Sequence, residues 1–579
     1  MVRAGAWSQI RELLSGSATS IGRVLLLGLA ASLFTMAAQF GWSYASLVSR
    51  SSWFQNFGFP IPMIGIWKAP AISSLPGFHF YPYFWGFIQN SIFWSILSFA
   101  LLFMWITAKS NVPFALLPAY VVGLAWARIQ LELQMAIAAM GSIIAYAQID
   151  PFSYAQITAY FVMALLLFPV VITTVARVNF KEIFRLCSIG FLIILLPPVV
   201  DNYILAKPVV YNFFTHGFPV GSIDPLYTIG VLSGGIKLEI LLVAVSSLIY
   251  LVYRTRSLVK SVSAVLGAFL LFVLVSTPVV TSRLNLGLSQ PQLFAGYLVI
   301  SYALIIIGFS LAQPGLGNLI LKHTRLRGMH FPAMTLFGLF LLHPTILAAG
   351  TREEVGIAVA GTFVVFLVWQ TAVVFDDIFD RAQEVPLGYL AFGLLIAVVA
   401  VLAATPLGDV PLLLTFIAVY LAIDYPRLRR KHFLLSGAVI GFSSCTAFLF
   451  GAMLPIRSAS SSEPLACITL AVLVTFFGAS FLKDITSVEA DAKSGIPTIF
   501  TKFGTKHALP IVATLVAFGF TFPAVFFINL ADRLLFLAAG TGVWFLIVLL
   551  KHRSYEPVLA LYFIEGFLVF LGKFVIGVA

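Results

Sequence analysis

Long apolar segments recur along the whole 579-residue chain. Stretches such as Val24 to Ala38 and Ile240 to Tyr253 are apolar on every face, and a helix needs about 20 such residues to cross the hydrocarbon core of a bilayer. A membrane β-barrel would instead show short segments of alternating polarity. The pattern therefore predicts an all-α polytopic membrane protein.

The C-terminal half is predicted to cross the membrane nine times. Its apolar runs occupy residues 331–349, 355–375, 389–405, 410–424, 433–453, 464–482, 508–529, 534–550 and 556–577. The loops on one side of these runs hold fourteen Lys and Arg residues, and the loops on the other side hold three. Because basic residues concentrate in cytoplasmic loops, the first run should begin in the cytoplasm and the C-terminus should lie outside.

The N-terminal half is harder to divide into spans. Its apolar runs occupy residues 24–45, 86–108, 155–176, 187–206, 228–253, 262–280 and 293–312, and the region 111–148 is too long for one simple span. If that region crosses once and adds a re-entrant or interfacial piece, the basic residues at 177–185 and 254–260 lie in the cytoplasm; two crossings would put them outside. We therefore expect eight N-terminal crossings, about 17 in the whole chain, and a cytoplasmic N-terminus.

The segment from Gln313 to His323, which contains Pro314 and Gly315, is the predicted boundary between the two halves. It divides the chain into an N-terminal multi-spanning domain of unknown role, residues 1–315, and a C-terminal domain, residues 316–579.

Five charged residues of the N-terminal half are predicted to be buried. They are Arg128 with Glu132 at i+4, Lys237 with Glu239, and Asp201. Ionisable groups inside a membrane are costly and usually functional. Two interpretations remain open, a polar pathway through the N-terminal domain or structural pairing of the charges.

The composition excludes a soluble enzyme. Hydrophobic residues make up 60% of the chain and charged residues 10%, with a mean hydropathy of +1.03, whereas a soluble domain is about 25% charged. The net charge of +12 reflects membrane topology, so no nucleic-acid partner is expected. The cysteines Cys187, Cys445 and Cys467 lie far apart, which argues against a disulfide framework or a zinc site.

Acidic residues gather in two short windows that each follow a predicted cytoplasmic helix end. Seven of the 22 acids lie there, namely Asp376, Asp377, Asp380, Glu384, Asp484, Glu489 and Asp491. In each window three oxygen-bearing residues have the helical offsets i, i+3 and i+7, so they share one helix face. Crowded carboxylates repel one another unless a cation binds them. Either window alone is equally well read as a solvated loop, but the pair predicts a divalent-cation site.

Magnesium is the cation that this pattern favours. Mg²⁺ typically accepts one or two carboxylates and fills its other positions with water and phosphate oxygens. The basic residues Arg381, Lys483 and Lys493 stand beside the acids and suit direct contacts to phosphate oxygens. The expected ligand is therefore a diphosphate bridged by Mg²⁺.

Three features of the C-terminal half resemble the UbiA-type intramembrane prenyltransferase superfamily, over about residues 318–579. The family motif Asn/Asp-Asp-x-x-Asp-x-x-x-Asp is similar to Asp376-Asp377-Ile378-Phe379-Asp380-Arg381-Ala382-Gln383-Glu384. A second motif resembles Lys483-Asp484-Ile485-Thr486-Ser487-Val488-Glu489-Ala490-Asp491, where Ser487 and Ala490 replace the common Asp and Gly. A tyrosine followed by basic residues resembles Tyr425-Pro426-Arg427-Leu428-Arg429-Arg430.

The resemblance implies a nine-helix bundle that transfers a polyprenyl group from a prenyl diphosphate to a lipophilic acceptor. By resemblance, the catalytic and metal-binding residues are Asp377, Asp380, Asp484 and Asp491. The implied substrate-binding residues are Asp376, Arg381, Glu384, Tyr425, Arg429, Arg430, Lys483 and Lys493. For the basic run from Arg427 to Lys431, a topology anchor is an equally good interpretation. We expect the protein to be integral to a prokaryotic cell membrane, with cytoplasmic Asp-rich loops.

The acceptor and the alternatives to this function stay open. The first motif continues with Val385-Pro386-Leu387-Gly388-Tyr389 instead of the Asn-, Pro- and Arg-Pro-containing segment of many family members. This segment is compatible with several acceptors, namely aromatic acids, phenols and glycerol-lipid alcohols. It is also compatible with phosphoribosyl transfer to a polyprenyl phosphate. A cation-coupled secondary transporter and a catalytically inactive lipid-binding or scaffold protein are the competing functions.

Overall fold

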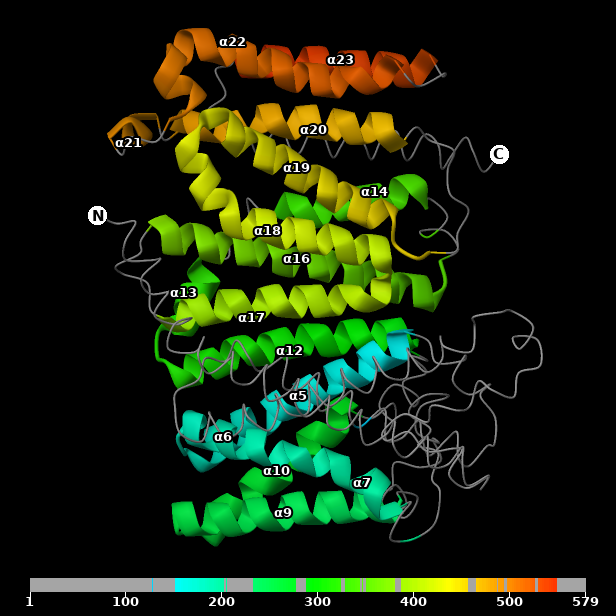
Figure 1. Ribbon diagram of the computed structural model, residues 1–579, viewed down its shortest axis with the longest axis vertical. Coiled ribbons are helices and arrows are strands. Elements are labelled where there is room, and N and C mark those ends of the chain that lie inside the picture. Colours follow the sequence, from blue (N-terminus) through cyan, green and yellow to red (C-terminus); the bar gives the residue numbers. More distant parts are fainter. Residues whose placement is uncertain are drawn as a thin grey trace, which may run out of the picture. The chain divides into compact units, whose positions relative to one another are not determined.

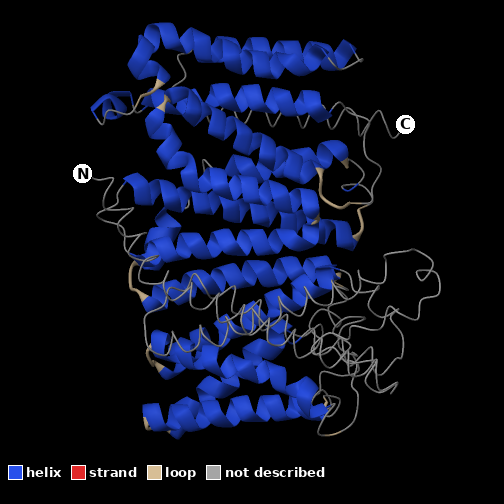
Figure 2. Cartoon of the chain, in the orientation of Figure 1, coloured by secondary structure: helices blue, strands red, loops and turns tan. Residues whose placement is uncertain are grey.

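The computed structural model describes 13 parts of the chain. They are residues 128, 151–201, 205, 233–276, 288–323, 329–343, 346, 350–380, 387–456, 465–486, 488–493, 497–525 and 530–548. All regular secondary structure in these parts is helical, as Figures 1 and 2 show. The all-α fold class is confirmed.

Two compact units make up the described chain. The C-terminal unit contains the described residues of Ser289–Ala295 and Asn318–Ala579, and the N-terminal unit contains those of Trp7–Leu288 and Gly296–Gly317. Helices α12 and α13 include residues of both units.

Apolar helices make up the described part of the N-terminal unit, and Figure 1 labels them. They are α5 (Pro151–Ala176), α6 (Phe180–Gly190), η4 (Phe191–Leu195), α7 (Leu196–Val199), α9 (Gly234–Thr255) and α10 (Leu258–Ser276), together with the shared helices α12 (Gln290–Ala312) and α13 (Leu316–His323). The Asn179 side chain accepts a hydrogen bond from the Lys181 amide at the start of α6, and Ser233 caps α9 in the same way.

The predicted span at residues 187–206 is helical throughout residues 187–201, but its helix type changes along the chain. The end of α6 passes into the 3₁₀ turn η4 and then into the short helix α7, and the junction residues keep right-handed helical dihedral angles. Helix α7 contains Pro197 and Pro198, and proline removes a helical N–H donor and clashes with the preceding turn. Helix α6 buries one face, with Phe180, Ile183 and Phe184, and exposes Lys181, which is typical of an interfacial helix.

Two of the four described charges of this set are buried. Arg128 donates a hydrogen bond to the carbonyl oxygen of Ile194, and Asp201, which is 1% exposed, accepts one from the Gly235 amide at 2.7 Å. Lys237, by contrast, is exposed, and Glu239 is only half-buried. The prediction of burial is therefore wrong for these two residues, which belong to the first turns of α9, and Glu132 lies outside the described residues.

In the described residues of the C-terminal unit, eight helices are long or of medium length; Figure 1 shows their arrangement. They are α14 (His330–Leu342), α16 (Arg352–Asp380), α17 (Leu387–Ala404), α18 (Asp409–Lys431), α19 (Phe433–Ala452), α20 (Leu465–Leu482), α22 (Ile499–Thr521) and α23 (Leu530–Val548). The short elements between them are η7 (Thr405–Leu407), η8 (Lys483–Thr486), α21 (Val488–Lys493) and η9 (Phe522–Val525). The ninth predicted run, 556–577, lies outside the described residues.

Small residues bring the central helices of this unit close together. Gly338 of α14 lies against the carbonyl oxygen of Phe448 in α19, and Gly451 of α19 lies against that of Thr335. Gly437 of α19 likewise lies against the side chains of Ser480 and Phe481 in α20. Glycine at such contacts lets helix backbones approach closely, as is common between membrane helices.

The chain is an integral membrane protein, but the count of about 17 membrane helices is not supported. In the described parts, eight helices are long and apolar enough to cross a membrane. Four more apolar helical segments of 10–17 residues lie in the described parts, namely Leu258–Phe272, His330–Leu342, Ile468–Leu482 and Arg533–Val548. The predicted spans at 24–45 and 86–108, and all of 111–148 except Arg128, lie outside the described residues.

Candidate functional site

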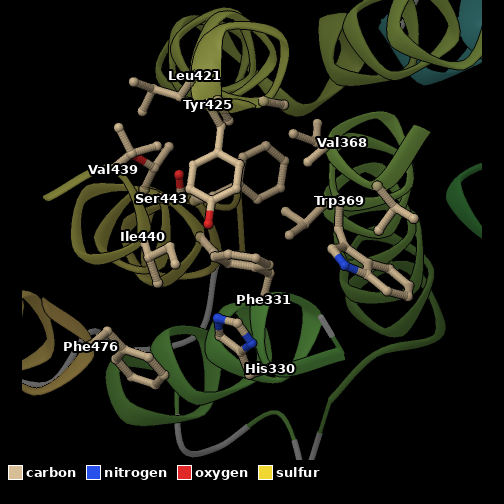
Figure 3. Close-up of a pocket in the computed structure, with 18 of the residues that line it drawn as sticks. His330, Phe331, Val368, Trp369, Leu421, Tyr425, Val439, Ile440, Ser443 and Phe476 are labelled. Carbon is tan, nitrogen blue, oxygen red and sulfur yellow. The ribbon is translucent and has the colours of Figure 1, made fainter. Parts of the chain in front are cut away.

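A cavity of about 240 Å³ lies inside the C-terminal unit, between α14, α16, α18, α19 and α20. Most of its wall is aliphatic or aromatic, with Val368, Trp369, Leu421, Ile440 and Phe476 among the lining side chains (Figure 3). Predominantly apolar pockets with a few polar groups are typical ligand sites. This cavity suits a hydrocarbon with a polar end.

Titratable groups of the cavity wall come from three helices. They are His330 of α14, Asp376 of α16 and Tyr425 of α18. In Figure 3 the Tyr425 hydroxyl points toward the side of the cavity where Phe331 and His330 lie. The His330 ring stacks on Phe476, with ring centroids 5.3 Å apart. The polar side chains of these three residues therefore border the same cavity as the apolar side chains.

The first acidic motif ends helix α16, and its first two carboxylates take different environments. Asp376 lines the cavity, with its Oδ1 atom 3.8 Å from a guanidinium nitrogen of Arg429. Asp377 is 3% exposed and accepts a hydrogen bond from the Tyr389 hydroxyl of α17 at 3.2 Å. Consecutive helix residues point in different directions, which explains the split. Asp380 is the last residue of α16, and its side chain, with Arg381 and Glu384, lies outside the described part.

The second acidic motif directly follows helix α20. Asp484 lies in η8 and is 6% exposed. Ser480, one helical turn earlier in α20, lines the cavity. Asp491 and Lys493 belong to α21 and Lys483 to η8, but the side chains of these three residues are outside the described part. Both motifs therefore follow helices that border one cavity.

The basic run at the end of α18 divides into two kinds of residue. Arg429 lies beside Asp376, and a guanidinium nitrogen of Arg430 donates to the Phe379 carbonyl oxygen at 3.0 Å. Arg427 and Lys431 are exposed, and Arg427 lies 3.9 Å from Asp424 of its own helix. Only the first pair reaches the end of α16, where the acidic motif begins.

Sequence reasoning missed two residues of this region. His330 is a single histidine at the start of α14, and Tyr389 follows the first motif by a few residues; neither belongs to a recognisable pattern. Tyr389 was noted only as a departure from the usual family segment. Its 0% exposure and its hydrogen bond to Asp377 depend on how α16 packs against α17, which spacing in the sequence does not reveal.

The oxygen donors of the described residues fit a bound magnesium ion in kind. Asp376, Asp377 and Asp484 supply carboxylates, and Arg429 and Arg430 supply cations for phosphate. Mg²⁺ needs only one or two carboxylates when phosphate oxygens complete its shell. The described side chains contain no group of three or more His, Cys, Asp or Glu residues arranged to hold a metal ion by themselves.

Comparison with known proteins confirms the resemblance of the C-terminal half. The model of the UbiA prenyltransferase family matches residues 385–570, beginning just after the first acidic motif. Digeranylgeranylglyceryl phosphate synthase of Sulfolobus acidocaldarius is 25% identical over 211 residues, which cover 35% of this chain and 74% of that protein. A solved structure of a digeranylgeranylglyceryl phosphate synthase is 18% identical, with a TM-score of 0.34, and covers 45% of this chain and 96% of that one.

Proposed function

We propose, from the UbiA prenyltransferase family domain in the C-terminal half of this chain, that the protein transfers a polyprenyl group from a prenyl diphosphate to a lipophilic acceptor within the membrane, with Mg²⁺ as cofactor. The observation that supports it most is the apolar cavity whose wall includes Asp376 of one acidic motif and Ser480, one turn before the other. An apolar chamber bordered by acidic and basic groups suits a donor with a hydrocarbon tail and a charged head.

The acidic and basic groups would hold the diphosphate end of the donor. In this proposal Asp377, Asp380, Asp484 and Asp491 hold the metal, which when bound neutralises charge on the departing diphosphate. Arg429, Arg430, Lys483 and Lys493 contact its oxygens, with Arg381 in the same role. Glu384 and Asp376 support the carboxylate set. Cationic groups fixed where negative charge develops stabilise the transition state of such a departure.

The cavity wall would hold the reacting prenyl carbon away from water. Departure of an allylic diphosphate leaves a cation-like carbon, and water reaching it would give an alcohol instead of the transfer product. The aliphatic and aromatic wall excludes water from this carbon. Tyr425 projects its hydroxyl into the same space and is proposed to position the acceptor or the diphosphate.

The remaining assignments concern the domains, the orientation and the acceptor. We propose that residues 316–579 form the transferase domain and that residues 1–315 shield, feed or scaffold its lipid substrate. The acidic motifs would face the cytoplasm of a prokaryotic cell. The name of the Sulfolobus relative makes a prenylated glyceryl phosphate the first acceptor to test, followed by aromatic acids and phenols.

Purified protein in lipid nanodiscs tests the proposal directly. With Mg²⁺, a radiolabelled prenyl diphosphate and this set of acceptors, we expect a prenylated product and an equal amount of diphosphate. Asp377→Ala and Asp484→Ala should reduce turnover at least 100-fold, roughly the cost of removing a group that stabilises transition-state charge. Full activity in either variant would overturn the assignment. Binding of the donor without turnover would instead favour an inactive lipid-binding protein, and cation-coupled uptake without diphosphate release would favour a transporter.

A further inference from the structure

The length of the cavity can be estimated from the lining residues of three helices, and the three estimates agree. Its wall runs from Asp376 to Val365 on α16, from Tyr425 to Leu414 on α18, and from Val439 to Phe450 on α19. Each run covers eleven residue steps, and a rise of 1.5 Å per residue gives a length of about 16 Å. Asp376 and Tyr425 mark the polar end of the cavity. Val365, Leu414 and Phe450 mark the opposite, deep end.

The deep end is closed where α16 meets α19. Phe450 is 2% exposed, and Leu454, one turn further along α19, is 3% exposed. A methyl group placed on Gly361 of α16, one turn beyond Val365, would lie 2.8 Å from Leu454 and 3.2 Å from the Phe450 ring. Gly361 therefore packs closely against both side chains, and α16 and α19 leave little room between them for a chain to continue. The Phe450 ring is therefore the end wall.

Two hydroxyl groups near the deep end are hydrogen-bonded within their own helices. The Thr415 hydroxyl donates to the Pro411 carbonyl oxygen and the Thr446 hydroxyl to that of Phe442, each at 2.8 Å within its own helix. A hydroxyl bound to its own helix in this way presents its methyl group to the cavity more readily than its hydrogen. This surface suits hydrocarbon and does not suit a diphosphate or an ionised acceptor.

From these dimensions we infer that Phe450 limits the length of the prenyl donor to about three isoprene units. Carbon–carbon bonds of about 1.5 Å make an extended isoprene unit roughly 5 Å long, so a cavity of about 16 Å holds three. A fourth unit requires the Phe450 ring to move or the tail to bend back toward the polar end. The inference rests on the proposed function, because it assumes that the diphosphate lies at the Asp376 end.

A series of donors of two, three, four and six isoprene units tests the inference. We measure kcat/KM for each donor in nanodiscs and, separately, the thermal stabilisation that each donor gives with Mg²⁺. For the natural sequence, kcat/KM should be highest with three units and about tenfold lower with four, the size of effect that a misfitting hydrocarbon produces in an apolar pocket. Phe450→Ala should raise the value for four units until it equals or exceeds that for three.

Two further variants separate length selection from general damage. Ala447→Leu, which adds volume to the same part of the wall, should shift the optimum to two units. Phe448→Ala removes a buried ring of the same helix that faces Phe337 of α14 and does not line the cavity, so the ratio between donors should stay as in the natural sequence. If the Phe450→Ala protein does not fold, the donor preference of Ala447→Leu tests the length limit by itself.

The outcomes distinguish this inference from the proposed function. The length limit would be overturned if kcat/KM were equal for three and four units in the natural sequence. It would also be overturned if neither Phe450→Ala nor Ala447→Leu changed the ratio of kcat/KM between donors. In both cases the transfer reaction itself would stand. If no donor reacts but stabilisation peaks at three units and shifts with Phe450→Ala, the length limit holds and the transfer chemistry fails. Absence of both turnover and stabilisation would overturn both.

Discussion

Arg429 of α18 lies 3.8 Å from the carboxylate of Asp376 in α16. The contact joins the basic run to the first acidic motif across 53 positions of sequence, and Asp376 itself lines the cavity. Both side chains are less than one fifth exposed, so the pair is more than a surface ion pair. It joins the ends of two cavity helices and, in the proposed function, puts a guanidinium group beside the diphosphate of the donor.

The first prediction concerns this guanidinium group. Arg429→Gln should lower kcat/KM for the donor by about 10- to 100-fold, since hydrogen bonds to charged groups contribute about 1.5–3 kcal/mol. Steady-state kinetics over a range of donor concentrations measure the change. Arg427→Gln is the matched control, because Arg427 is exposed on the same helix and its nearest acid is Asp424. Equal losses in both variants would show that general positive charge matters and that the Asp376 contact does not.

The second prediction concerns the hydrogen bond from Tyr389 to Asp377. Tyr389→Phe removes the hydroxyl donor but keeps the buried ring, so the carboxylate loses its orientation. Groups that orient a metal ligand typically contribute about 10- to 100-fold to metal affinity or activity. The Mg²⁺ concentration for half-maximal activity should therefore rise by about tenfold. Tyr420→Phe, on an exposed tyrosine of α18, should leave it unchanged. An unaltered Mg²⁺ titration for Tyr389→Phe would place Asp377 outside the metal site.

The third prediction concerns the contact between α14 and α19. A methyl group at Gly451 would collide with the backbone carbonyl of Thr335, which cannot rotate away as a side chain can. Gly451→Ala should therefore destabilise the C-terminal unit by about 1–3 kcal/mol, the usual cost of overpacking. Thermal unfolding in detergent measures the loss. Gly542→Ala, on α23 where nothing lies within 4 Å, should be neutral or stabilising. Similar unfolding temperatures for both variants would contradict the packing.

Some features of the fold were predictable from sequence, and others depended on packing. Hydropathy located the helices that became α16, α18 and α19, because apolar runs near 20 residues have few other uses. It did not reveal the change of helix type at residues 187–201, where the 3₁₀ turn η4 and the prolines of α7 interrupt regular α-helical hydrogen bonding. Hydropathy averaged over a window carries no information on such a change.

The candidate site shows the same division. The acidic motifs and the basic run could be identified from the sequence because charged residues are rare in this apolar chain. In the structure Asp376 lies beside Arg429. The roles of His330 and Tyr389 escaped prediction, since one histidine and one tyrosine carry no spacing signal. The position of the end wall at Phe450 could not be predicted for a different reason. It depends on Gly361 of another helix, and no local sequence pattern predicts a contact between residues 89 positions apart.

The last prediction concerns the pH dependence of the N-terminal unit. Glu182 of α6 accepts a hydrogen bond from the Tyr250 hydroxyl at 2.7 Å and another from Arg254 at 2.9 Å, both on α9. The Tyr250 hydrogen bond, helped by Arg254 and opposed by partial burial, lowers the pKa of Glu182 below its ordinary value of 4.5. A lowered folded-state pKa means that the ionised carboxylate stabilises the fold above pH 4.5 and that this contribution is lost as the pH falls through the lowered value.

Glu182→Gln should therefore unfold at a lower temperature than the natural sequence at pH 7, and the difference should shrink as the pH falls below 4.5. Thermal unfolding between neutral pH and the acid limit of folding measures this narrowing. Tyr250→Phe should reproduce part of the effect, because it removes the hydrogen bond with the largest influence on the pKa of Glu182. Tyr253→Phe, three residues further along α9 on an exposed ring, should show no such dependence. A constant difference between Glu182→Gln and the natural sequence at every pH would show that Glu182 stabilises the α6–α9 contact by packing alone.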